Sequence, residues 1–143
     1  MCIAARLRTG ARAAGARMLR RTMAASERMQ RGSAAERRAA RILTGAGFEL
    51  VVCNYRCRMG ELDLVARRGQ LLVIAEVRQR TSADFGGAAA SITTRKRRRI
   101  VCAARHLLQA RPSLARLAVR FDALLVDGAD GPVQWIAAAF EAT

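Results

Sequence analysis

The sequence reads Gly60-Glu-Leu-Asp-Leu-Val65, then the turn signal Arg67-Arg-Gly-Gln70, then Leu71-Leu-Val-Ile-Ala-Glu-Val-Arg78. Both flanking runs are rich in apolar and β-branched residues, and a glycine between them is typical of a tight hairpin turn. We therefore predict two antiparallel strands, over residues 60–66 and 71–79. Asp63 in the first strand and Glu76 in the second each lie among aliphatic residues, which is costly unless the acid has a partner.

The two acids, Asp63 and Glu76, should lie close together. A two-residue turn at Gly69-Gln70 places Asp63 directly opposite Glu76, whereas a turn at Arg68-Gly69 moves Glu76 one diagonal step away. In both registers the side-chain period of two puts the carboxylates and Arg78 on one face of the sheet. Adjacent carboxylates repel each other, so a divalent metal between them, backed by a fixed cation, is one favourable arrangement.

Each acid also has a purely structural interpretation. Asp63 is compatible with a solvent-facing strand position, and Glu76 with an internal salt bridge to Arg78 or Arg80. A third acid, Glu36, completes the pattern Ser33-Ala-Ala-Glu36, which is a capping box that opens a helix. From the residues alone, capping outweighs catalysis at Glu36.

The remaining segments supply the elements around this hairpin. The helix that follows Ser33 should bury the stripe Ala35, Ala39, Ile42, Leu43 and Ala46. Residues 48–55 are β-like, a second helix is predicted over residues 94–109, and strands follow over residues 117–126 and 133–137, the last with Trp135 as its core anchor. The expected fold class is α/β, a mixed central β-sheet flanked by helices, in the order α-β-β-β-α-β-β. We expect one domain over residues 31–143 and a basic, disordered N-terminal arm over residues 1–30.

The charge of the chain favours phosphate-rich partners. Its 26 cations against 11 acids give a net charge of +15, which favours nucleic acid first and an anionic membrane second. The densest basic run is Thr94-Arg-Lys-Arg-Arg-Arg99, and it contains the sole lysine of the chain, Lys96. Cations at a helix N-terminus oppose the macrodipole by about 0.3–1 kcal/mol each, which suggests that an anion normally sits there. We therefore predict that the nucleic-acid-binding residues are Arg95, Lys96, Arg97, Arg98 and Arg99.

Composition also indicates the compartment. No apolar run reaches the roughly 18–20 residues that cross a bilayer, and no secretory signal is evident, so we expect no membrane partner. The pair Cys53 and Cys57 is not followed by a second close pair, so reduced structural thiols are favoured over zinc ligands. A cytoplasmic location fits these features best.

Several motifs in fixed order resemble the bacterial YraN family. They are Arg31-Gly-x-x-Ala-Glu36, Asn54-Tyr-Arg-Cys-Arg-x-Gly60-Glu-Leu-Asp63-Leu, Glu76-Val-Arg78-x-Arg80, Phe85-Gly-Gly-Ala and Ile92-Thr-x-x-Lys96, and they cover most of residues 31–141. The resemblance implies a restriction endonuclease-like fold, related to archaeal Holliday junction resolvases and tRNA-splicing endonuclease-like domains. The PD-(D/E)xK signature of that superfamily is a metal-binding acid on one strand, followed by acid-x-lysine on the next.

The resemblance also implies roles for individual residues. Asp63 and Glu76 match the acids that bind Mg²⁺ or Mn²⁺, Glu36 matches an acid from the first helix, and Arg78 stands at the lysine position. These four would be the catalytic residues of a nucleic-acid-binding, metal-dependent endonuclease, with DNA preferred to RNA as the partner. Arginine is effectively never deprotonated, so its presence at Arg78 puts hydrolysis in question. Two alternatives therefore stay open: a non-catalytic nucleic-acid-binding or scaffold protein that retains the nuclease fold, and a partner-binding module whose basic arm seeks anionic surfaces.

Overall fold

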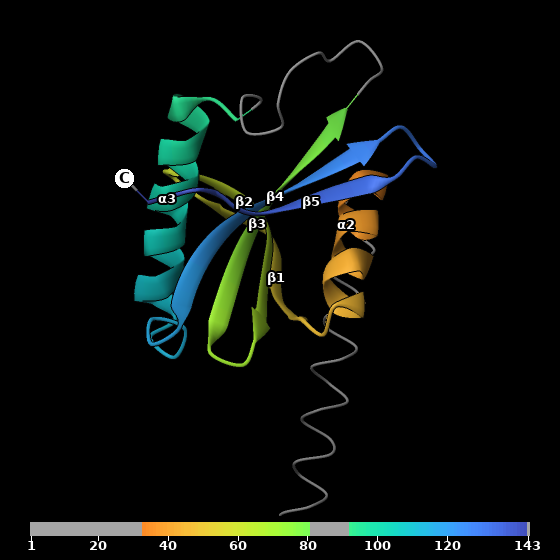
Figure 1. Ribbon diagram of the computed structural model, residues 1–143. Coiled ribbons are helices and arrows are strands. Elements are labelled where there is room, and N and C mark those ends of the chain that lie inside the picture. Colours follow the sequence, from red (N-terminus) through yellow and green to blue (C-terminus); the bar gives the residue numbers. More distant parts are fainter. Residues whose placement is uncertain (1–32, 81–91, 143) are drawn as a thin grey trace, which may run out of the picture.

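The computed structural model describes residues 33–80 and 92–142, in which a five-stranded mixed sheet separates two helices (Figure 1). The elements are α2 (Ala34–Gly45), β1 (Glu49–Cys57), β2 (Gly60–Arg68), β3 (Leu71–Arg80), α3 (Thr94–Ala110), β4 (Ala118–Asp127) and β5 (Val133–Phe140). The predicted α/β class and the order α-β-β-β-α-β-β are therefore confirmed. The predicted arm over residues 1–30 and the motif Phe85-Gly-Gly-Ala lie outside the described residues.

The strands lie in the order β1-β2-β3-β4-β5. Neighbours are antiparallel except β3 and β4, which are parallel and are connected through α3. This crossover makes β3 the central strand, so both of its faces are covered and residues 72–76 are all buried. Glu76 is the charged member of that buried run, as the sequence suggested.

The β2–β3 hairpin has the first of the two registers considered. Arg68 pairs with Leu71, which leaves Gly69 and Gln70 as the turn. Gly69 has a φ of 59°, a left-handed conformation that glycine adopts without steric cost. Backbone pairing then runs as far as Leu64 opposite Ala75 and stops before the two acids.

Helix α2 covers one face of the sheet and begins as predicted. The Ser33 hydroxyl accepts a hydrogen bond from the Glu36 backbone N–H at 3.2 Å, and the Glu36 carboxylate accepts one from the Ser33 N–H at 3.4 Å. The residues that α2 buries are Ala39, Ala40 and Leu43. The prediction was wrong for Ile42, whose side chain is 40% exposed, because the buried stripe is rotated toward Ala40.

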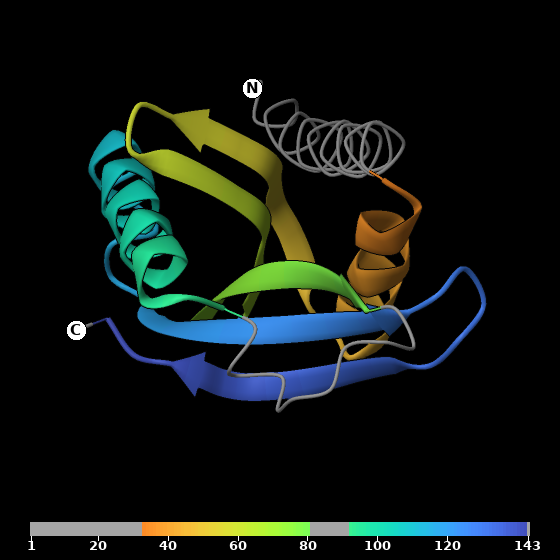
Figure 2. The same ribbon diagram turned by 90° about the horizontal axis from the view of Figure 1, so that it is seen from above.

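Helix α3 covers the opposite face, as the view from above shows (Figure 2). It buries Ile100, Val101, Ala103, Ala104 and Leu107 against residues of β2, β3 and β4. Its first turns pass very close to the start of β2, since a Cβ built on Gly60 would lie 2.8 Å from the Arg99 carbonyl oxygen. The absence of a side chain at Gly60 therefore allows α3 to lie this close to the start of β2.

A buried polar network joins β4 to β5, and the sequence did not reveal it. Asp122 is fully buried and accepts two hydrogen bonds from the Arg120 guanidinium, both at 2.8 Å. It also accepts one from the Trp135 indole N–H at 2.9 Å and one from the Ala138 backbone N–H at 3.0 Å. Trp135 is half-buried rather than fully enclosed, and the strand around it continues to Phe140, beyond the predicted end at residue 137.

Neither of the two described helices combines the length and apolar character that a membrane span requires.

Candidate functional site

Asp63 lies where strands β2 and β3 separate. Opposite it in β1, Asn54 has a φ of 53°, and its neighbours Cys53 and Tyr55 pack into clusters on opposite faces of the sheet. In a regular strand, residues two apart face the same side of the sheet. The left-handed backbone at Asn54, which asparagine tolerates, therefore bends the β1–β2 ribbon at this point. The Asp63 carboxylate accepts a hydrogen bond from the Val77 backbone N–H at 2.9 Å, which occupies a β3 donor beyond the last backbone pair.

Glu76 lies on the central strand β3, beside Asp63. Its side chain is only 5% exposed, and the two carboxylates are close enough to interact directly. The Lys96 ammonium lies 3.5 Å from Glu76 Oε1. The site therefore contains two acids from adjacent strands and one cation from the start of α3.

The electrostatics of this pair favour a bound cation. Burial, followed by the negative charge of Asp63, raises the pKa of Glu76 to about 7. The pKa of Asp63 is raised as well, by burial first, although the Val77 N–H opposes that effect. Lys96 lowers both values but does not restore either to its ordinary range, so the pair is incompletely neutralised.

Glu36 contributes to the site from the first turn of α2. Its carboxylate caps the helix through the Ser33 N–H, as the capping-box pattern in the sequence predicted. Its negative charge also raises the pKa of Asp63, which places it within electrostatic reach of the acid pair. Capping and proximity to the site are therefore compatible for this residue.

The two arginines that follow Glu76 on β3 differ in their surroundings. Arg80 forms a two-bond ion pair with Asp127, at 2.8 and 3.1 Å, rather than the alternative salt bridge to Glu76. Arg78 is half-buried, and strand alternation places its side chain on the same side of β3 as Glu76. The acid pair thus receives its close cation from Lys96 on α3, with Arg78 further along the strand.

The basic run at the start of α3 divides into two groups. Lys96 points to the acid pair, while Arg97 donates to the Ile92 carbonyl at 2.9 Å and lies over the Phe140 ring at 5.6 Å. Arg95, Arg98 and Arg99 are exposed, and their three- and four-residue spacing puts them on one helix face. Of the five residues predicted to bind nucleic acid, these three therefore share one exposed helix face.

The donor set fits a hard, partly hydrated cation. Within residues 33–80 and 92–142, no three His, Cys, Asp or Glu side chains gather in a way that could enclose a metal. Mg²⁺ does not need such a cage, because it commonly binds through one or two carboxylates and completes its shell with water and substrate phosphate oxygens. Asp63 and Glu76 supply that number and kind of ligand, and oxygen donors also suit Mn²⁺.

The sequence missed the contact between Lys96 and Glu76. The available signal was the single lysine in a chain that otherwise uses arginine for every cation. The contact itself depends on how α3 crosses the sheet after the β3–β4 connection, which no local pattern specifies.

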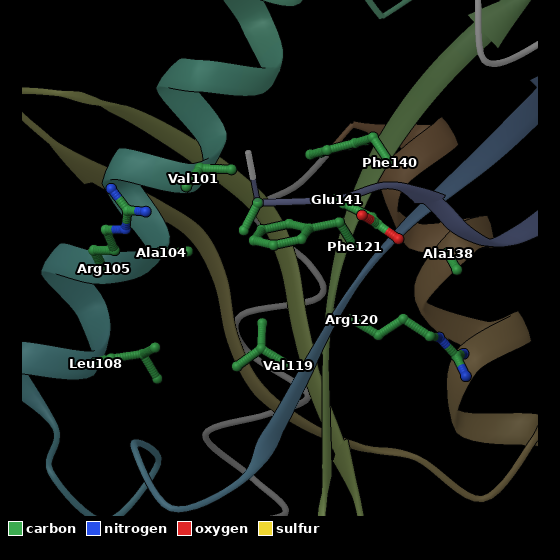
Figure 3. A pocket seen from close by; sticks show the side chains of 11 residues that line it. Val101, Ala104, Arg105, Leu108, Val119, Arg120, Phe121, Ala138, Phe140 and Glu141 are labelled. Atoms are coloured by element: carbon green, nitrogen blue, oxygen red, sulfur yellow. The ribbon is translucent and has the colours of Figure 1, made fainter.

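A separate hollow of about 450 Å³ lies between α3 and the β4–β5 ribbon (Figure 3). Its walls are mainly apolar, from residues such as Val101, Leu108, Val119 and Phe121, with Arg105 and Glu141 among them. Arg120 also borders it but is committed to Asp122. The hollow shares no residue with the acid pair and offers no comparable group of interacting acids.

Comparison with known proteins gives the family. Residues 35–126 match the family described as "Uncharacterised protein family UPF0102". A UPF0102 protein of Alkalilimnicola ehrlichii is 46% identical over 123 residues, which cover 86% of this chain and 96% of the relative. UPF0102 proteins of Dechloromonas aromatica and Xanthomonas oryzae pv. oryzae are 52% and 50% identical, over 78% and 80% of this chain and 89% and 94% of the relatives.

The chain therefore belongs to UPF0102, the YraN family, as its motifs suggested.

Proposed function

We propose that this protein binds nucleic acid and hydrolyses phosphodiester bonds with the help of Mg²⁺ or Mn²⁺. The observation that carries the proposal is the Asp63–Glu76 pair: two interacting carboxylates on adjacent strands, both with a raised pKa. A structural ion pair would normally lower the pKa of its acid, as Arg80 does for Asp127. The acid pair instead has the excess negative charge that attracts a divalent cation.

In this proposal Asp63 and Glu76 hold the metal, and the charge of Glu36 strengthens the attraction. When bound, the metal would polarise the phosphate and lower the pKa of the attacking water. Two carboxylates leave the remaining ligand positions to water and substrate oxygens, which is the arrangement that phosphate chemistry requires.

The reaction consumes one water molecule per bond cut. The water oxygen forms a bond to phosphorus while the bond from phosphorus to the leaving sugar oxygen breaks. The proton released by the water passes to solvent, and the leaving oxygen takes up a proton from solvent. Arg78 would stabilise the negative charge that builds on the phosphate oxygens. The exposed arginines of α3, Arg95, Arg98 and Arg99, would bind neighbouring backbone phosphates without reading bases.

One observation favours a second candidate, a binding protein without catalysis. Arg78 occupies the strand position two residues after the second acid, and arginine supplies charge but cannot exchange a proton at neutral pH. A protein of this kind would retain the basic surface of α3 and bind nucleic acid without cutting it.

A nicking assay separates the two candidates. The full-length protein, Asp63→Asn, Glu76→Gln and Arg78→Lys are incubated with linear and branched DNA and with RNA duplexes, in Mg²⁺, in Mn²⁺ and in EDTA. Asp130→Asn is the matched control, because it removes an exposed carboxylate from the β4–β5 turn. We expect metal-dependent nicking by the wild type, Asp130→Asn and Arg78→Lys, and its loss in the two site variants. If the wild type and Arg78→Lys bind nucleic acid but neither cuts it, the nuclease proposal is wrong and the binding protein remains.

A further inference from the structure

Lys96 differs from every other cation of the chain in its chemistry, and its ammonium contacts the acid pair. It is the sole lysine, and its ammonium lies 3.5 Å from a carboxylate that is itself 5% exposed, while the lysine side chain is 35% exposed. It therefore lies partly in solvent and partly against the acid pair. An ordinary backbone contact would instead point outward, as the exposed Arg98 does two residues later.

The first turn of α3 is held in place by several independent contacts. The Thr93 hydroxyl caps it through the Lys96 N–H at 3.2 Å, and Arg97 donates to the Ile92 carbonyl at 2.9 Å. Next to these, the Arg99 backbone lies against Gly60, at the start of the strand that carries Asp63. The backbone position of Lys96 is thus set relative to both acids by the fold.

Lysine and arginine differ at such a position in the shape of the charged group and in the freedom of its hydrogen-bond donors. The ammonium is a compact charge with three rotatable donors, whereas the guanidinium is a rigid planar fork. A compact charge can turn from a carboxylate oxygen to a nearby phosphate oxygen with a small side-chain movement. A lone lysine at this point is therefore suited to an anion that arrives beside Glu76.

Building on the nuclease function proposed above, we propose that Lys96 is a catalytic residue that contacts the reacting phosphate itself, rather than one of the residues that hold the nucleic-acid backbone. Without substrate its ammonium rests on Glu76 and offsets part of the charge of the acid pair. With substrate in place it donates a hydrogen bond to a non-bridging oxygen of the phosphate under attack and keeps its proton. The negative charge that builds on that oxygen would then be stabilised from α3 as well as from Arg78 on β3.

The proposed role of Lys96 predicts a specific combination of effects on the cleavage rate, metal binding and nucleic-acid binding. Removing the ammonium should slow the chemical step at saturating substrate, because the lost contact is made to the reacting group. It should leave metal binding unchanged or tighter, because one positive charge no longer competes for Glu76. A residue that only holds the backbone would show the reverse: weaker nucleic-acid binding and an unchanged rate once the substrate is saturating.

The test uses the full-length protein, Lys96→Gln, and Lys96→Arg as a charge-conserving variant in case the first does not fold. Arg105→Gln is the matched control, because it removes an exposed cation from the same helix. Three quantities are measured: Mn²⁺ affinity by electron paramagnetic resonance without nucleic acid, affinity for a fluorescein-labelled four-way DNA junction in EDTA, and the single-turnover cleavage rate of that junction at saturating protein.

We expect Lys96→Gln to lose about 100-fold or more in single-turnover rate, which is the typical loss when one charge-stabilising donor is removed. Its Mn²⁺ affinity should equal or exceed that of the wild type, and Lys96→Arg should recover part of the rate. Arg105→Gln should keep both the junction affinity and the saturated rate of the wild type. A Lys96→Gln rate within a few-fold of the wild type at saturation, while the wild type binds Mn²⁺ and cuts, would refute this inference alone. A wild type that neither binds Mn²⁺ nor cuts would refute the proposed function and this inference together.

Discussion

The acid pair should make the folded state less stable as the pH rises from about 4.5 to about 7. Burial and the charge of Asp63 raise the pKa of Glu76 from its ordinary 4.5 to about 7, so between these values the folded state binds a proton that the unfolded state has released. Stability rises with pH only where the unfolded state binds more protons, so here it must fall. At about 1.4 kcal/mol per pH unit, the difference between the two pKa values of this nearly buried side chain corresponds to a total loss of about 3 kcal/mol in unfolding free energy. The raised pKa of Asp63 acts in the same direction.

Glu76→Gln mimics the protonated side chain and should remove most of this dependence. Urea unfolding is measured in EDTA at about pH 5 and about pH 8 for the wild type and the variant. Relative to the wild type, Glu76→Gln should gain about 2.5 kcal/mol in unfolding free energy between the two pH values, because the unfolded-state glutamate is already mostly ionised at pH 5. Asp127→Asn is the control, since the ion pair with Arg80 lowers the pKa of this half-buried carboxylate, which therefore titrates below this window. A difference between Glu76→Gln and the wild type that stays constant from pH 5 to pH 8 would show that Lys96 fully balances Glu76, and the electrostatic argument for a metal would fail.

Three further predictions concern the framework of the site. Gly60→Ala should destabilise the protein by about 1–3 kcal/mol in urea unfolding, because the new Cβ would lie 2.8 Å from the Arg99 carbonyl oxygen; an unchanged midpoint would refute the close contact. Asp122→Ala should cost about 3–5 kcal/mol, since it leaves the Arg120 guanidinium without its buried partner, whereas a loss below about 1 kcal/mol would mean that the network contributes little. Ser33→Ala should cost about 1 kcal/mol and lower the helical circular dichroism only slightly, and no change in stability would show that the capping box is not formed in solution.

The elements of the fold could be predicted because their signals are local. The capping box marked the start of α2 at the correct residue, and the glycine turn fixed the β2–β3 register to one of two choices. The order of the strands and the parallel pairing of β3 with β4 could not be predicted in the same way. They arise from contacts between segments far apart in the chain, on which hydrophobic periodicity carries no information.

The candidate site was predictable to a similar extent. Asp63 and Glu76 were found because an acid within an aliphatic strand is costly, and this cost is visible in the sequence. The contact of Lys96 with Glu76 was missed. The sequence does not show which cation of a basic run faces the sheet, because this depends on how the helix packs. Asp122 was missed for a related reason: it follows Phe121 at a register shift between β4 and β5, so strand alternation did not indicate that its side chain is enclosed.

The most direct test of the central claim is a calorimetric titration of Mn²⁺ into the full-length protein at about pH 8, where the acid pair is largely ionised. Asp63→Asn and the exposed control Asp130→Asn are titrated alongside. We predict one saturable site per chain in the wild type and in Asp130→Asn, and none in Asp63→Asn. Binding of equal strength in Asp63→Asn, or none in the wild type, would contradict the account of Asp63 and Glu76 as a metal-binding pair.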